Sequence, residues 1–123
     1  PQAPFAYGQW FETLELNTKV FLLSPRDKLV IGYGGQSCVW CKDIINFREK
    51  VPDVTPQELH QFLKERNYKY LIINPRMDEK YLKAKFNNTG SQKLQQLYQE
   101  IQNSKLFPFD RQVGEFFFVL RVE

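Results

Sequence analysis

The stretch that most constrains the fold covers residues 55–74, where a helix signal passes directly into a strand signal. Thr55 and Glu58 have the spacing of a capping box, and the proline after Thr55 suits the first helical position. The apolar residues that follow recur at helical spacing (Leu59, Phe62 and Leu63). Residues 68–74 then form a run whose Leu-Ile-Ile centre suits a central parallel strand, buried on both faces. A helix placed between strands in this way predicts a right-handed βαβ unit.

The other periodic segments complete an α/β chain. We expect strands at residues 19–23 and 29–31, short helices at residues 8–16 and 78–86, a loop at residues 87–90 and a helix at residues 91–103. Two further strands, at residues 105–109 and 115–122, would form a C-terminal β-hairpin with Gly114 in its turn. The predicted fold is α/β: a mixed-sheet sandwich with helices packed on it, one βαβ unit and a C-terminal β-hairpin.

Length and charge exclude several classes of protein. The 123 residues, 42% of them apolar, suit a single soluble domain spanning residues 1–123. No run approaches the ~20 apolar residues of a membrane span. The net charge of +3 comes from basic residues mixed with acidic ones, so the basic stripe of a nucleic-acid-binding protein is missing. We therefore expect no nucleic-acid partner.

The first residues suggest a larger parent protein. The chain starts with Pro1 and Gln2, and its single methionine is Met77. We therefore expect residues 1–123 to be a domain excised from a longer chain, which would carry any signal or membrane span.

Cys38 and Cys41 form the sharpest chemical signal, a Cys-x-x-Cys after a glycine-rich bend. At a helix N-terminus the dipole would lower the pKa of the first thiol and make it reactive, as in thioredoxin-like enzymes. Against this, Trp40 stands between the cysteines, whereas the thioredoxin family usually has tryptophan before the first. A helix from Cys38 would also have to end before Pro52. Two buried thiols or a structural disulfide remain the alternatives.

No other constellation points to catalysis. His60 is the only histidine, so a zinc site would lack ligands, and we expect this side chain to be solvated on its helix. Neither a nucleophile–histidine arrangement nor a paired acid and base stands out among the carboxylates. Asn87-Asn88-Thr89 matches the short N-glycosylation pattern. We assign no catalytic residue, no metal ligand and no cofactor.

Four segments together resemble a known family. They are residues 19–23 (Lys-Val-Phe-Leu-Leu), the helix start at 55–59, residues 68–74 (Tyr-Lys-Tyr-Leu-Ile-Ile-Asn) and residues 116–122 (Phe-Phe-Phe-Val-Leu-Arg-Val). In this order the chain resembles the C-terminal soluble domain of GT-C-type membrane glycosyltransferases, the group of dolichyl-phosphate-mannose protein mannosyltransferases and aminoarabinose transferases.

The resemblance implies a polytopic parent enzyme that uses a lipid-linked sugar donor. This domain would be membrane-associated through the parent chain and would lie on the extracytoplasmic (periplasmic) side. On that side Cys38 and Cys41 could be oxidised. Its partners would be the remainder of the parent chain and a glycan or protein acceptor. The family's catalytic carboxylate lies near the membrane spans and has no counterpart here, so no catalytic residue is carried over.

Three functional hypotheses follow. The leading one is a non-catalytic extracytoplasmic accessory domain of a membrane glycosyltransferase. The alternative is a thioredoxin-like thiol-disulfide oxidoreductase, with Cys38 as nucleophile and Cys41 as resolving thiol. The third is a standalone protein-interaction module with exposed aromatic side chains.

Overall fold

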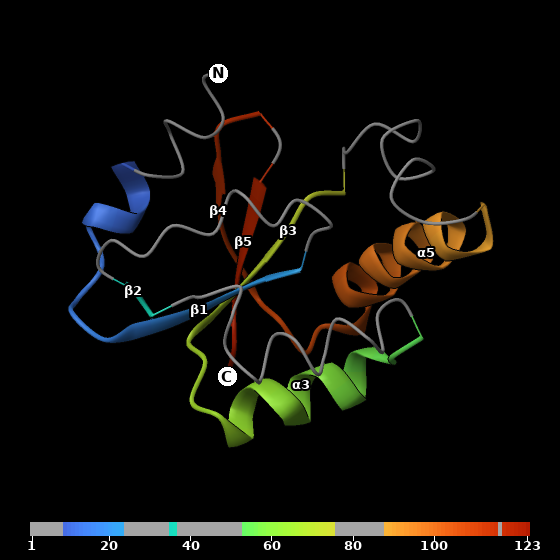
Figure 1. Cartoon of the computed structure of the whole chain (residues 1–123), viewed down its shortest axis with the longest axis horizontal. Helices are drawn as coiled ribbons and strands as arrows, with labels where there is room; N and C mark the ends of the chain where they lie inside the picture. The colour runs from blue at the N-terminus through green and yellow to red at the C-terminus, as the bar shows by residue number, and fades with distance from the viewer. Residues whose placement is uncertain (1–8, 24–34, 37–52, 76–87, 116) are drawn as a thin grey trace.

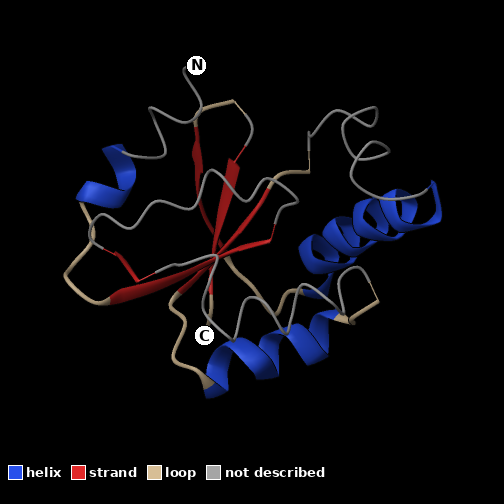
Figure 2. Cartoon of the chain, viewed as in Figure 1, coloured by secondary structure: helices blue, strands red, loops and turns tan. Residues whose placement is uncertain are grey.

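The computed structural model describes residues 9–23, 35–36, 53–75, 88–115 and 117–123 (Figures 1 and 2). Its strands are β1 (Thr18–Leu23), β2 (Gly35–Gln36), β3 (Tyr70–Ile73), β4 (Phe109–Val113) and β5 (Phe117–Arg121). Its helices are α3 (Pro56–Glu65) and α5 (Asn88–Ser104), preceded by a single helical turn at residues 9–12. Within these residues no helix is both long and apolar enough to cross a membrane.

The described strands form one mixed sheet in the order β2-β1-β3-β5-β4. Strand β1 runs parallel to both β2 and β3, whereas β5 runs antiparallel to both β3 and β4. Helix α3 lies between β1 and β3 in the chain, so these elements form the expected βαβ unit. The mixed sheet and the C-terminal hairpin confirm the predicted α/β fold.

Helix α3 begins and ends where its sequence predicts. The Glu58 backbone N–H donates to Thr55 Oγ1 at 3.1 Å, and the Thr55 N–H donates to Glu58 Oε1 at 3.2 Å. This reciprocal pair satisfies two N–H groups that the first helical turn would otherwise leave without partners. After the helix, Asn67 takes a φ of 62°. This is the left-handed conformation that commonly ends helices, and asparagine tolerates it better than most residues other than glycine.

Replacing the cap should weaken this helix measurably. We expect Thr55→Ala to lower the free energy of unfolding by about 1 kcal/mol, because it removes the acceptor for the Glu58 N–H. Urea denaturation measures the loss. Gln57 is exposed and lies in the first turn of the same helix, so Gln57→Ala is the matched control. It should change the free energy of unfolding by less than ~0.5 kcal/mol. Equal losses at the two positions would show that the cap contributes nothing specific.

The sheet buries side chains on both faces, because successive residues of each strand point to opposite faces. On β1, Phe21 and Leu23 belong to one core cluster, while Val20 and Leu22 belong to the other. Strands β3 and β5 follow the same alternation. The first cluster packs against α3 and α5 (Leu59, Leu63, Leu94, Leu97, Tyr98 and Ile101). Figure 1 shows both helices on the same side of the sheet.

The second face is covered by the helical turn at residues 9–12. Trp10 and Phe11 join the cluster that contains Val20, Leu22 and Ile72. The Trp10 ring meets Tyr70 edge-on, with ring centroids 5.4 Å apart, a geometry that aromatic pairs favour. The sheet is therefore enclosed by helical elements on both faces. The predicted helix at residues 8–16 is shorter than expected, since the chain turns after residue 12 and Leu16 is 82% exposed.

Two predicted boundaries near the C-terminus are wrong. The predicted loop at residues 87–90 is helical from Asn88 onward, because α5 extends through weak helix formers that the sequence pattern assigned to a loop. The predicted strand at residues 105–109 is a connection. Lys105 has a φ of 62°, and Leu106 and Phe107 then turn into the first core cluster. Strand β4 begins only at Phe109, so the hairpin turn falls at Gly114 and Glu115.

Other predictions lie outside the described residues. They are the strand at residues 29–31, the helix at residues 78–86, the glycosylation asparagine Asn87, and both cysteines, Cys38 and Cys41.

Candidate functional site at the carboxyl edge of the sheet

The carboxyl ends of β1 and β3 lie side by side, with Leu23 paired to Ile73. The chain passes from β1 to β2 on one side of β1, and then to β3 on the other side. This reversal makes the β1–β3 boundary a topological switch point. In open α/β sheets, ligands bind outside the carboxyl ends of the strands at such a point. This edge is therefore the part of the fold best placed to hold a ligand.

Asn74 follows β3 directly at this edge and is only 5% exposed. Among the residues that the structure describes, it is the one buried polar or charged residue. Its Oδ1 atom is buried and accepts no hydrogen bond from the part of the chain that the structure describes. Buried acceptors are nearly always paired, because desolvating one without a partner costs about 1–3 kcal/mol. Asn74 thus breaks the rule that the rest of the described core obeys.

Tyr98 brings a second polar group to the same edge. It lies on the buried stripe of α5, and its hydroxyl donates to the Leu23 carbonyl oxygen at 2.7 Å. Burial raises the pKa of Tyr98 well above its usual range, and a hydrogen bond with the Asn74 backbone acts in the opposite direction. Tyr98 therefore remains an uncharged hydroxyl that ties α5 to the ends of both parallel strands.

The Tyr98 hydroxyl should make stability depend on alkaline pH. The unfolded chain releases this proton above pH 10, the ordinary tyrosine pKa, whereas the folded protein retains it. Stability should therefore fall by up to ~1.4 kcal/mol per pH unit above that value because of this one group. Tyr98→Phe should lower stability by about 1 kcal/mol at neutral pH and remove this contribution. Denaturant titrations of both proteins from neutral to alkaline pH measure the difference; parallel curves would contradict the assignment.

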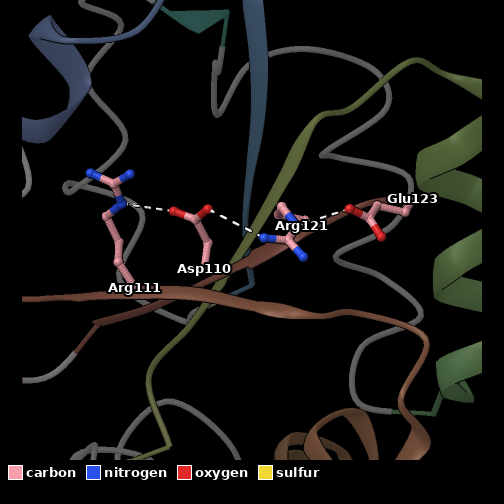
Figure 3. A network of polar contacts seen from close by, with 4 residues as sticks. All are labelled: Asp110, Arg111, Arg121 and Glu123. Atoms are coloured by element: carbon pink, nitrogen blue, oxygen red, sulfur yellow. Dashed lines mark hydrogen bonds and ion pairs between the residues drawn. The ribbon is translucent and has the colours of Figure 1, made fainter.

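A polar network lies at the C-terminal hairpin, away from the Asn74 edge in the strand register (Figure 3). Asp110 occupies a bulge, since Phe109 pairs with Leu120 and Arg111 already pairs with Val119. The Arg111 Nε donates to Asp110 Oδ2 at 2.7 Å, and Arg121 Nη1 lies 3.9 Å from Asp110 Oδ1. Arg121 also bonds the carboxylate of Glu123 at 2.9 Å. Each carboxylate of this network contacts an arginine, and the contact between Arg121 and Asp110 links β5 to β4. The network therefore has a structural role in the hairpin.

His60 is not the solvated helix residue that the sequence predicts. It is half-buried, its Nε2 lies 2.7 Å from the Glu123 carbonyl oxygen, and its ring meets Phe107 edge-on. His60 therefore links Glu123 to α3. In the described ranges, no three histidine, cysteine or acidic residues gather as a metal site would require.

The site predicted from sequence and the site seen in the structure are different. The structure does not describe Cys38 and Cys41; the nearest described residues are Gly35 and Gln36 of β2, at the edge of the sheet. Sequence reasoning missed Asn74 and Tyr98 as a pair. A usable signal was present for Asn74, a polar residue at the end of an apolar strand, where α/β proteins place their ligands.

Comparisons with known proteins add no family. No protein-family model matches the chain, and no curated protein matches its sequence.

Proposed function

We propose that this chain is a non-catalytic extracytoplasmic accessory domain of a membrane glycosyltransferase that uses a lipid-linked sugar donor. Its partners are the membrane-embedded remainder of the parent chain and a glycan or protein acceptor. The domain assists recognition of the acceptor or of a partner, and the transfer chemistry takes place elsewhere in the parent.

One observation carries the proposal. Two of the segments on which the family resemblance rests contain β3 (Tyr70–Ile73) and β5 (Phe117–Arg121), and these two strands pair antiparallel. Leu71 faces Leu120 and Ile72 faces Val119 across this pair. The similar segments are thus the centre of one structural unit, which supports a relationship at the level of the whole domain.

The engaged carboxylates offer further support. Glu58 caps α3, Asp53 pairs with Lys93 at 2.6 Å, and Asp110 sits between its two arginines. In each of these contacts the carboxylate has a structural partner, either a capping N–H or a basic side chain. The neutral pair Asn74 and Tyr98 suits binding better than proton transfer.

Membrane topology tests the proposed location. In the full-length protein with Cys38→Ser and Cys41→Ser, Leu16→Cys introduces one thiol at a position that is 82% exposed. A membrane-impermeant maleimide added to intact cells should label this thiol. The buried Ile72→Cys is the matched control and should stay unlabelled in the folded protein. Labelling of Leu16→Cys only after permeabilisation would place the domain on the cytoplasmic side and overturn the proposal.

A reduction assay separates the thioredoxin-like alternative. The chain with both cysteines should fail to catalyse insulin reduction by dithiothreitol, and Cys38→Ser should behave like the unchanged protein. Catalysis that depends on Cys38 would replace the accessory-domain proposal with an oxidoreductase.

A further inference from the structure

Strand β4 forms an open edge of the described sheet. It is the last strand in the order β2-β1-β3-β5-β4, and β5 is the one described strand with which it pairs. Its outer side is accessible, since Phe109 is 56% exposed and the Arg111 side chain is 55% exposed. An exposed edge offers unpaired N–H and C=O groups to another chain, and the Phe109 ring adds apolar surface beside them. Because a second copy of this chain carries the same edge, two unprotected β4 strands could join two sheets.

The outward backbone groups of β4 lie on both sides of a bulge. The Arg121 N–H donates to the Pro108 carbonyl oxygen at 2.8 Å, so Pro108 faces β5. Because successive residues of a strand direct their N–H and C=O groups to opposite sides, those of Phe109 face outward. Gln112 lies opposite Phe118, three residues before Arg121 on β5, and the same alternation directs the groups of Gln112 outward. A strand that pairs with this edge would have to bond both Phe109 and Gln112.

Asp110 is the extra residue between these two positions. A bulge bends its strand and increases the local twist, so the outward groups on its two sides point in different directions. Bulges and charged side chains keep the exposed edges of many sheets from pairing with other chains. The Asp110 side chain is only 15% exposed and contacts Arg111 at 2.7 Å and Arg121 at 3.9 Å, which holds the bulge in place. Arg111 also keeps a charge at the edge, which an approaching strand would have to desolvate.

We propose that the bulge at Asp110, held by Arg111 and Arg121, prevents β4 of one molecule from pairing with β4 of a second copy. The network in Figure 3 then has a second role besides linking β5 to β4. This protection is required whether or not the chain belongs to a glycosyltransferase, since the exposed edge is present in either case.

Deletion of Asp110 removes the bulge and leaves the other pairs in register, since Phe109 stays opposite Leu120 and Arg111 stays opposite Val119. Arg111→Thr in the same variant removes the arginine that the deletion leaves without its nearest carboxylate. The matched control carries Asp110→Asn and Arg111→Thr, which removes the same charges and retains the bulge residue. Sedimentation velocity over a range of protein concentrations measures self-association.

We expect the unchanged chain and the control to sediment as monomers and the deletion variant to form a dimer. The dissociation constant of that dimer should be at least ~10-fold lower than for any association of the control, equivalent to about 1.4 kcal/mol. Hydrogen exchange of the Phe109 and Gln112 amides should slow as the deletion variant dimerises, because these groups become paired. In the unchanged chain the exchange of both amides should stay fast at every concentration, which tests the open edge without any substitution.

A folded deletion variant that associates no more strongly than the control would overturn the proposal. An unchanged chain whose Phe109 and Gln112 amides become protected at high concentration would also overturn it, because β4 would then be an interface between two copies. Neither result bears on the maleimide labelling of the full-length protein, so the edge protection and the proposed function fail independently.

Discussion

Leu71→Ala is expected to lower the free energy of unfolding by about 3 kcal/mol, a large share of the stability of a domain this size. Leu71 is fully buried on β3, where it pairs with Phe21 of β1 on one side and with Leu120 of β5 on the other. Its side chain also belongs to the core cluster beneath α3 and α5. Truncation would leave a cavity that neighbours on three sides cannot fill without moving the sheet.

Chemical denaturation measures this loss, and the chain provides a matched control. Leu16 is the same residue type at 82% exposure, so Leu16→Ala should change stability by less than ~0.5 kcal/mol. Similar effects at the two leucines would contradict a core centred on β3.

Phe11→Ala is expected to lower the free energy of unfolding by about 3–4 kcal/mol, although Phe11 lies in a single helical turn. The ring is fully buried and packs with Trp10, Val20 and Ile72 on the face opposite α3 and α5. A short turn has little helical stability of its own, so its order depends on this anchoring ring. Loss of Phe11 should therefore uncover the second face of the sheet.

The exposed neighbour Glu12 serves as the control, since Glu12→Ala should be nearly neutral to denaturation. The fluorescence of Trp10, measured in native buffer with Trp40→Phe in both proteins so that Trp10 is the one tryptophan, gives an independent signal. In Phe11→Ala it should shift to longer wavelength as the indole gains solvent. A Phe11→Ala protein with the stability and emission of the unchanged chain would show that the turn does not cover the sheet.

Local sequence signals predicted the centre of the fold well. Helix α3 carries its own start in Thr55 and Glu58 and its own stop in Asn67, and each acts within a few residues. The strand that follows is an uninterrupted apolar run, so its burial on both faces was readable from residue type alone. The local signals for α3 and β3 agree with one another, and tertiary contacts leave the predicted elements unchanged.

The strand bounds of the C-terminal hairpin were harder to predict, because its apolar residues do not coincide with its strands. Leu106 and Phe107 look like strand residues, yet they turn into the core from a connection. Phe109, by contrast, begins β4 although it is 56% exposed. The bulge at Asp110 then shifts the register by one residue. Apolar character reports burial, and here it could not distinguish a buried connection from a buried strand.

The candidate site depends on contacts between distant segments. The Tyr98 hydroxyl reaches the Leu23 carbonyl oxygen across 75 residues of sequence, and it meets the Asn74 backbone as well because β1 and β3 are neighbours. No spacing in the sequence indicates such a meeting. The cysteine motif drew attention because its two cysteines lie three positions apart in sequence, whereas the buried asparagine stands out only once its surroundings are known.

The most direct test of the central claim is the steady-state kinetics of sugar transfer by the full-length protein from a polyprenyl-phosphate-linked donor. We predict that the protein transfers sugar to an acceptor, with a measurable kcat and a measurable KM for the acceptor. The variant with Cys38→Ser and Cys41→Ser should keep both constants. Absence of transfer, or loss of kcat in the cysteine variant, would contradict an accessory domain of a glycosyltransferase.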